Sequence, residues 1–343
     1  MSEKSFTTVT FGVIARNERK YLPDLLQDLR AQTYPRNLIE VILVDGCSDD
    51  ETFSIMENFQ QEYLKDYLDI KIYTNPKKNQ PSGWNVVLKN TTSDVILRID
   101  AHAKLPKDFI KNNMLCINSG EDVCGGPREN IIDEQTPWKQ MLLDAEQSMF
   151  GAGIATYRNA TEKKQYVKSV FHAAYKREVF EKVGLFNEYL IRTEDNEMHY
   201  RIRQAGYRIC YDPSISSKYQ TRNTLGRMLK QKYQNGLWIG RTLFICPGCI
   251  SIFHLVPFAF LMGILFTSLL FVMGIKWPAI LLWCLYALAN LLMTITAVVT
   301  SSNKSILCCL LPFTFLLLHL SYGIGTLNGM LTAGMSRREA LRS

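Results

Sequence analysis

Residues 41–52 read VILVDGCSDDET, an apolar run that ends in an acidic turn. Four aliphatic residues in a row before Asp45 are typical of a strand buried on both faces, as in a parallel sheet covered by helices. Around this stretch, short apolar runs alternate with amphipathic stretches over roughly the first 130 residues. We therefore predict an α/β domain with a Rossmann-like, mostly parallel sheet.

Polar residues follow each predicted strand of this domain. The expected strands are 9–15, 40–45, 70–74 and 95–100, and the expected helices are 19–32, 50–65, 83–90 and 107–118. Ligands of such sheets bind beside the carboxyl ends of the strands. Those ends carry Arg16-Asn17-Glu18, Asp45-Gly46-Cys47-Ser48, Asn75-Pro76-Lys77-Lys78 and Asp100-Ala101-His102. We expect the four strand ends to face one site.

The composition changes sharply near residue 246. Between Cys246 and Ser336 there is no Asp or Glu, and the only charges are Lys276 and Lys304. Three apolar runs, 249–274, 278–300 and 305 to about 329, are each long enough for the ~20 residues of a bilayer-spanning helix. We therefore expect three membrane segments. More than half of the net charge of +7 arises after Cys246, so nucleic acid is not an expected partner.

The expected compartment follows from the N-terminus and the cysteines. The first ten residues show no apolar stretch behind a basic start, as a secretory signal requires, so we expect the first domain in the cytosol and the Asn90 and Asn159 sequons unmodified. The nine cysteines are scattered and do not suggest a disulfide framework. Cys246 and Cys249 have CxxC spacing, but a structural zinc site usually needs four ligands.

Two strand ends carry residues with definite chemistry. The carboxylate of Asp45 can accept hydrogen bonds from a ribose or a base, although a turn before a helix is, for this residue taken alone, the commoner role of an Asp. Asp100 and His102 alternate along a strand end, which places two metal ligands on one side; the plain alternative is a capping carboxylate beside a surface histidine. No GxGxxG follows the first strand and no P-loop is present.

Two later segments carry further candidates. Glu194 and Asp195 begin a helical pattern, where acidic residues are electrostatically favoured; either could be a general base, and capping alone would explain one of them. Residues 231–241, QKYQNGLWIGR, form a basic and aromatic stretch directly before the membrane segments. Such a stretch is typical of a helix lying on a bilayer surface.

Five segments together resemble a known family. They are FGVIARNE (11–18), VILVDGCSDDET, NPKKNQPSGWNVVLKNTTSDVILRIDAH (75–102), VGLFNE (183–188) and RTEDNEMHYRIRQAGYRI (192–209). In this order they resemble the inverting family-2 glycosyltransferases of the GT-A fold, from about residue 8 to residue 238. The sequence DAH at 100–102, together with HLSYGIGTLNG at 319–329, is similar to the corresponding segments of the membrane-anchored succinoglycan-type glucosyltransferases of exopolysaccharide assembly.

The resemblance assigns roles to individual residues. It implies a UDP-sugar donor held by Ala15, Asn17, Glu18, Asp45, Lys78, Asn85, Arg98 and Asp100. It implies Mg²⁺ or Mn²⁺ at Asp100 and His102, with His102 in place of a commoner Asp, and Asp195 as the base beside Glu194. The acceptor would meet Gln234, Trp238 and Arg241. Leu237 stands where polymerising relatives have Arg, which argues against processive synthesis.

The expected organisation is a GT-A domain at 1–222, an interfacial amphipathic segment at 223–248, a transmembrane region at 249–331 and a basic tail at 332–343. The expected function is inverting transfer of a hexose from a UDP-sugar to a saccharide on a polyprenyl diphosphate. The expected place is the bacterial inner membrane, with membrane lipid and polysaccharide assembly proteins as partners. Two alternatives stay open: a polyprenyl-phosphate sugar synthase, which would not need Asp195, and a non-catalytic assembly subunit.

Overall fold

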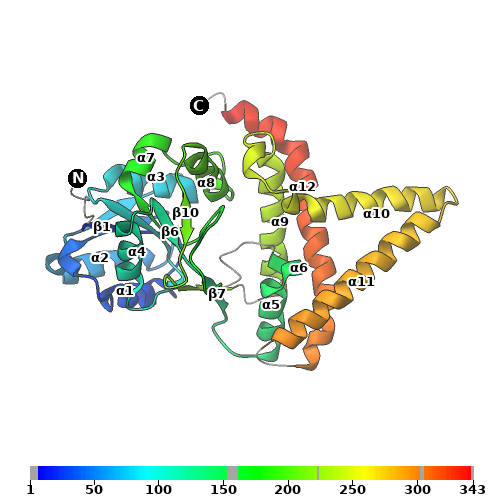
Figure 1. Cartoon of the computed structure of the whole chain (residues 1–343), viewed down its shortest axis with the longest axis horizontal. Helices are drawn as coiled ribbons and strands as arrows, with labels where there is room; N and C mark the ends of the chain where they lie inside the picture. Colours follow the sequence, from blue (N-terminus) through cyan, green and yellow to red (C-terminus); the bar gives the residue numbers. More distant parts are fainter. Residues whose placement is uncertain (1–6, 153–160, 222–223, 302–304, 341–343) are drawn as a thin grey trace. The chain divides into compact units, whose positions relative to one another are not determined.

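A computed structural model describes residues 7–152, 161–221, 224–301 and 305–340, with the backbone only at 152 and 334–340. The Asn159 sequon, Lys304 and Arg342 lie outside the described residues. The chain forms two compact units (Figure 1). The sheet unit comprises residues up to Glu129 and Thr156–Gln220, and the helical unit comprises Asn130–Ala155 and Thr221–Ser343.

The sheet unit is built on an eight-stranded sheet with the order β3-β2-β1-β4-β9-β6-β10-β8. Its strands are β1 (Val9–Ala15), β2 (Ile39–Asp45), β3 (Asp69–Thr74), β4 (Val95–Asp100), β6 (Val123–Gly125), β8 (Gln165–Tyr166), β9 (Ala173–Lys176) and β10 (Ile209–Tyr211). The first four are parallel, as predicted, and β9 runs antiparallel between β4 and β6. The predicted α/β architecture with a mostly parallel sheet is therefore confirmed.

Helices and a small second sheet complete this unit. They are α1 (Leu22–Arg30), α2 (Thr52–Tyr63), α3 (Gln80–Asn90), α4 (Phe109–Asn118), α7 (Arg177–Val183), α8 (Glu194–Gln204), and the three strands β5 (Ala103–Lys104), β11 (Ser217–Gln220) and β7 (Arg128–Ile131). In α1 the apolar residues Leu22, Leu25, Leu26 and Leu29 recur at helical spacing, and all four are buried against the sheet core. This pattern explains why α1 forms where the sequence predicts it.

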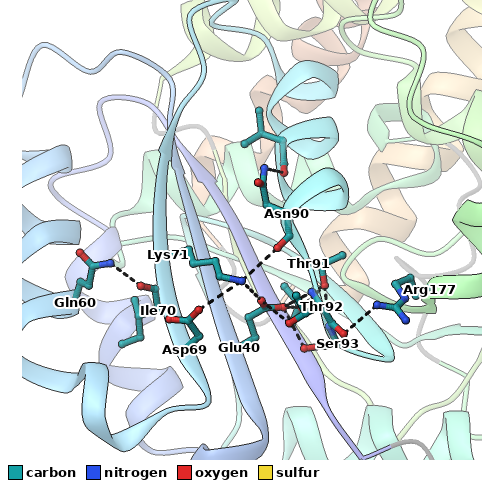
Figure 2. A network of polar contacts seen from close by, with 12 residues as sticks. Glu40, Gln60, Asp69, Ile70, Lys71, Asn90, Thr91, Thr92, Ser93 and Arg177 are labelled. Carbon is teal, nitrogen blue, oxygen red and sulfur yellow. Dashed lines mark hydrogen bonds and ion pairs between the residues drawn. The ribbon is translucent and has the colours of Figure 1, made fainter.

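Glu40 lies near the amino end of β2 and bonds residues of the neighbouring strands (Figure 2). This end of the sheet is opposite the one at which β2 ends in Asp45. The Glu40 carboxylate is buried and accepts from Thr10 Oγ1 at 2.6 Å, Lys71 Nζ at 2.6 Å, Thr92 N at 3.0 Å and Ser93 Oγ at 3.2 Å. Burial alone would raise the pKa of Glu40, but the bonds from Lys71, Thr10 and Thr92 lower it to about 2. The network therefore stabilises β1, β2, β3 and the turn before β4 around one ionised carboxylate.

The helical unit contains the predicted membrane segments. Its helices are α5 (Pro137–Gln147), α6 (Met149–Ala152), α9 (Leu225–Thr242), α10 (Val256–Val272), α11 (Trp277–Thr300) and α12 (Leu311–Ala340). Three stretches, Ile252–Val272, Trp277–Thr300 and Ile306–Ala333, are long and apolar enough to cross a membrane. Gly274, at φ +90, ends α10 and allows the tight turn into α11.

Helices α9 and α12 lie side by side (Figure 1), and glycines of both helices line their contact. Gly236 and Gly240 are four residues apart on α9, and Gly325 and Gly329 are four apart on α12. A Cβ at Gly236 would lie 2.1 Å from the carbonyl oxygen of Tyr322, and one at Gly329 would lie 2.1 Å from that of Leu237. Pairs of small residues four apart on each helix let the backbones of α9 and α12 approach closely. The segment predicted to lie on the bilayer surface thus packs along the third apolar stretch.

Residues 130–155 group with the helical unit, whereas the predicted first domain runs over 1–222. On α5, Met141, Leu142 and Ala145 are buried in one cluster with Leu311 and Phe315. The amphipathic pattern of α5 predicts a helix but does not reveal which partner covers its apolar face.

Two polar contacts also join α5 and α6 to the other helices of this unit. Lys232 on α9 forms a buried ion pair with Glu146, at 3.3 Å, and His319 Nε2 donates to the carbonyl oxygen of Phe150 at 2.8 Å.

Candidate functional site

The ends of β1, β2 and β4 come together as predicted. The sheet register pairs Ala15 with Asp45 and Ile14 with Asp100, so β1 ends between the two aspartates. Neighbouring strands lie about 4.8 Å apart. Asp45 and Asp100 therefore flank the end of β1 on two sides, at the sheet edge where α/β proteins bind ligands.

The turns after β1 and β2 are bonded to each other. Asp45 is buried and accepts from the Ser48 hydroxyl at 2.6 Å and from Ser48 N at 3.2 Å. Asn17 N donates to Ser48 Oγ at 3.0 Å, and Asn17 Oδ1 accepts from Asp49 N at 2.8 Å. These bonds fix the backbone around Asp45 before any ligand binds.

Left-handed backbone is concentrated at this edge. Within the described residues, the non-glycine positions with positive φ are Asn17 (58°), Cys47 (54°) and Lys78 (55°). Each follows the end of a different strand, β1, β2 or β3. Such conformations carry strain and gather at functional sites, because the surrounding structure must impose them. They support a ligand site along these three turns.

Asn85, on α3, is bonded to the segment that precedes α8. Its amide nitrogen donates to the carbonyl oxygen of Phe186 at 3.0 Å and to Glu188 at 2.9 Å, and its oxygen accepts from Phe186 N at 2.8 Å. Lys77 forms an exposed ion pair with the same Glu188. Asn85 and Lys77 therefore anchor the segment before α8, whereas Lys78 stays exposed at the end of β3.

Asp100 lies among nitrogen-bearing side chains. Its Oδ1 is 3.5 Å from Gln80 Nε2, and its Oδ2 is 3.9 Å from His172 Nε2. Burial would raise the pKa of Asp100, but His172, His102 and the nearby arginines lower it, so the carboxylate is ionised. An ionised, mostly buried carboxylate is suited to holding a cation.

His102 is anchored through one ring nitrogen. Its Nδ1 lies 3.2 Å from Glu18 Oε1, and its ring meets Tyr219 edge to face at 4.8 Å. Burial lowers the pKa of His102, but the bond to Glu18 and the charge of Asp100 raise it to about 10. Its Nε2 is buried and finds no hydrogen-bond partner in the part of the chain that the structure describes.

These residues fit a divalent cation held by few protein atoms. The Asp100 carboxylate supplies oxygen, and the orphaned Nε2 of His102 can supply nitrogen once deprotonated, with Nδ1 bonded to a carboxylate as in many metal-binding histidines. Among the described residues, no three His, Cys, Asp or Glu side chains form a ready-made metal cage. An ion here would take its remaining ligands from a bound diphosphate.

The two acidic residues at the start of α8 have different surroundings. Glu194 is buried, with Oε1 2.8 Å from Arg98 Nη2, and its Oε2 has no partner among the described side chains and backbone. Burial and the nearby Asp195 raise the pKa of Glu194, which Arg98 opposes. Asp195 is partly exposed and accepts from Asn196 N at 2.8 Å. Asp195 is therefore the carboxylate that a substrate can reach.

Arg98, predicted to contact the donor, lies inside this unit. Besides Glu194, its guanidinium contacts the rings of Trp84 at 5.2 Å and Phe186 at 5.5 Å. Burial would lower the pKa of Arg98, but the charges of Glu194, Asp195 and Asp100 raise it. Its buried positive charge therefore interacts with the carboxylates of Glu194, Asp195 and Asp100.

The three predicted acceptor residues belong to the helical unit. Gln234, Trp238 and Arg241 are spaced along one face of α9. Trp238 is buried, Arg241 lies over its ring at 4.9 Å, and Arg241 Nε is 3.4 Å from Thr332 Oγ1. Trp238 and Arg241 thus contribute to packing within this unit.

His172 is a site residue that sequence reasoning missed. It is buried beside Asp100, and it precedes β9, whose register pairs Ala173 with Arg98 of β4. No motif marks it, because its position depends on an antiparallel pairing between strands far apart in the sequence. A buried histidine before a strand is by itself a weak signal.

The fold and the acidic strand ends define a class of protein, the glycosyltransferases of the GT-A fold. Residues 10–184, about half of the chain, match the family described as Glycosyl transferase family 2. The chain belongs to this family.

Two relatives and one solved structure are similar over most of the chain. A Methanococcus voltae enzyme, dolichyl N-acetyl-alpha-D-glucosaminyl phosphate 3-beta-D-2,3-diacetamido-2,3-dideoxy-beta-D-glucuronosyltransferase, is 26% identical over 324 residues, covering 92% of this chain and 94% of the relative. The succinoglycan biosynthesis protein ExoA of Rhizobium meliloti is 27% identical over 245 residues, covering 69% and 71%. The mannosyltransferase PcManGT of Pyrobaculum calidifontis, solved with GDP-Man and Mn2+, shares the fold with a TM-score of 0.59, at 16% identity and over 95% and 91% of the two chains.

Proposed function

We propose that this glycosyltransferase moves a hexose from a UDP-sugar, with inversion, onto a saccharide carried by a polyprenyl diphosphate. The observation that carries the proposal is the pairing at the start of α8. Arg98 engages the buried Glu194, whereas Asp195 stays partly exposed. An in-line displacement that inverts the anomeric carbon needs one base for the attacking hydroxyl, and one accessible carboxylate supports that chemistry.

The donor would bind at the ends of β1, β2 and β4. In this proposal Asp45 accepts hydrogen bonds from the uridine, and Ala15, Asn17 and Glu18 line the turn after β1 that holds it. Lys78, exposed after β3, supplies positive charge for the diphosphate. Asp100 and His102 would hold Mg²⁺ or Mn²⁺, which supplies charge neutralisation for the leaving group.

The protein's own residues perform the proton transfer. Asp195 takes the proton of the acceptor hydroxyl as the new glycosidic bond forms. Glu194 and Arg98 position the first turn of α8 and so hold Asp195 in place.

The acceptor is proposed to stay in the bilayer. Three stretches long enough to span a membrane follow the sheet unit in sequence, and the Methanococcus voltae relative is named for a dolichyl-linked acceptor. We infer that Gln234, Trp238 and Arg241 meet the acceptor's head group, and that the enzyme works in the cytoplasmic membrane with its sheet unit in the cytosol. Membrane lipid and polysaccharide assembly proteins would be its neighbours.

The test is an incubation of the purified full chain with UDP-sugars, GDP-sugars and dTDP-sugars, each with a polyprenyl-diphosphate saccharide. We expect one UDP-sugar to be consumed and its sugar to appear on the lipid-linked acceptor with inverted configuration. Transfer to polyprenyl phosphate alone would replace this proposal with a polyprenyl-phosphate sugar synthase. Consumption of none of the donors would favour a non-catalytic subunit.

A further inference from the structure

His172 has one ring nitrogen bonded and one unpaired beside Asp100. Its side chain is nearly inaccessible, and its Nδ1 lies 2.8 Å from the hydroxyl of Ser217. Its Nε2 is 3.9 Å from Asp100 Oδ2, too far for a hydrogen bond, and has no other hydrogen-bond partner among the residues described. A buried polar atom without a partner is costly, so such an atom needs an explanation.

The neighbouring strands fix this nitrogen in place. Because β9 pairs antiparallel with β4, the residue before Ala173 lies beside the end of β4, where Asp100 stands. Ser217, at the start of β11, holds the ring from its other side. His172 is thus oriented by two strands, and the ring cannot turn its Nε2 away without losing the bond to Ser217.

A second buried histidine shows what a purely structural role looks like in this unit. In His199, on α8, Nε2 is 2.8 Å from the hydroxyl of Tyr175 and Nδ1 is 2.9 Å from the hydroxyl of Ser169. Both of its ring nitrogens are bonded. The unpaired Nε2 of His172 is therefore not a general consequence of burying a histidine here.

We propose that His172 is a ligand, through Nε2, of the divalent cation at Asp100, with Ser217 accepting the Nδ1 hydrogen and so fixing the tautomer. The inference rests on the cation site of the proposed function and extends it to a residue outside the DAH motif. Metal-binding histidines usually donate a hydrogen bond from the other ring N–H to an oxygen, as His172 can do to the Ser217 hydroxyl. An imidazole beside a carboxylate favours a transition ion such as Mn²⁺ over Mg²⁺, which prefers oxygen ligands.

The test measures Mn²⁺ binding to the purified full chain in detergent, by calorimetry, with Mn²⁺ alone and with UDP present. We expect His172→Gln to weaken Mn²⁺ binding by at least about 10–100-fold, which is the loss typical even when only a supporting partner of a metal ligand is removed. His172→Asp should retain binding and shift the preference from Mn²⁺ toward Mg²⁺. His199→Gln, the matched control, should leave Mn²⁺ affinity unchanged.

A spectroscopic measurement separates a ligand from a residue that only supports the fold. Pulsed electron paramagnetic resonance of bound Mn²⁺ detects coupling to a coordinated imidazole nitrogen. In His102→Gln, remaining nitrogen coupling would come from His172, and we expect it to disappear in His102→Gln/His172→Gln. Absence of nitrogen coupling in His102→Gln, with Mn²⁺ bound, would overturn the assignment.

The outcomes also distinguish this inference from the proposed function. If Asp100→Ala abolishes Mn²⁺ binding while His172→Gln leaves it intact, His172 is not a ligand but the cation site stands. If the unaltered chain binds no Mn²⁺ even with UDP, both the ligand assignment and the cation site are wrong. Sugar transfer without added metal would then be measured separately, and its presence would leave the transfer reaction itself standing.

Discussion

Arg98 and Glu194 form a buried ion pair, with Nη2 2.8 Å from Oε1, although they are 96 residues apart in sequence. The pair links the strand that ends in Asp100 to the helix that begins with Glu194 and Asp195. It therefore couples the position of Asp195, the proposed base, to that of Asp100, which is proposed to bind the sugar donor. Breaking it should affect stability first, because it leaves a buried charge alone.

Glu194→Gln should destabilise the protein by about 3 kcal/mol at a pH where Glu194 is ionised, since Arg98 then loses its charged partner in a buried setting. Because the pKa of Glu194 is raised to about 8, the measurement is the unfolding temperature of the purified chain above that pH. The matched control is Glu181→Gln, which breaks the exposed pair with Arg177 and should change stability by less than about 1 kcal/mol. Equal effects of the two substitutions would contradict the role given to the buried pair.

The free energy of unfolding should decrease at low pH, and part of this decrease should come from protonation of Glu40. Its pKa is lowered from the ordinary 4.5 to about 2 in the folded protein, so its contribution is present above pH 4.5 and is lost as the pH falls toward 2. The shift corresponds to roughly 3 kcal/mol.

Comparing the unaltered chain with Glu40→Gln between pH 3 and pH 6 checks this contribution. The difference in unfolding free energy should grow from pH 3 to about pH 5 and stay constant above that pH. A difference that does not vary with pH would show that the ionised carboxylate is not what the network stabilises.

The glycine contact between α9 and α12 can be tested with two alanines on one helix. Gly236→Ala places a Cβ 2.1 Å from the carbonyl oxygen of Tyr322 and should destabilise the protein by about 1–3 kcal/mol. Gly226, also on α9, has no atom within 4 Å of such a Cβ, so Gly226→Ala should be neutral or slightly stabilising. Thermal unfolding in detergent measures both; a tolerated Gly236→Ala would argue against close backbone contact.

Local patterns predicted the elements of the sheet unit well. Strands buried on both faces are mostly apolar, so the predicted ranges 9–15 and 95–100 coincide with β1 and β4. The predicted start of α3 at 83 was three residues late. Asn79 caps the helix by accepting from Ser82 N, and Pro81 stands in the first turn; both signals were readable in the sequence.

What the sequence did not predict depends on contacts between distant segments. The place of His172 follows from the antiparallel pairing of β9 with β4, and the burial of Arg98 follows from its partner on α8. The grouping of 130–155 with the C-terminal helices depends on which surface covers Met141 and Leu142. Periodicity along the chain carries no information on such partners.

The most direct test of the proposed function is Asp195→Asn, assayed in parallel for UDP binding and for sugar transfer to a polyprenyl-diphosphate saccharide. The substitution keeps the shape of the side chain and removes the base. We expect UDP affinity to stay within error of the unaltered chain while the transfer rate falls by about 10²–10⁴-fold. Transfer at a near-normal rate would contradict Asp195 as the base and would favour an acceptor that is already ionised, as a polyprenyl phosphate is.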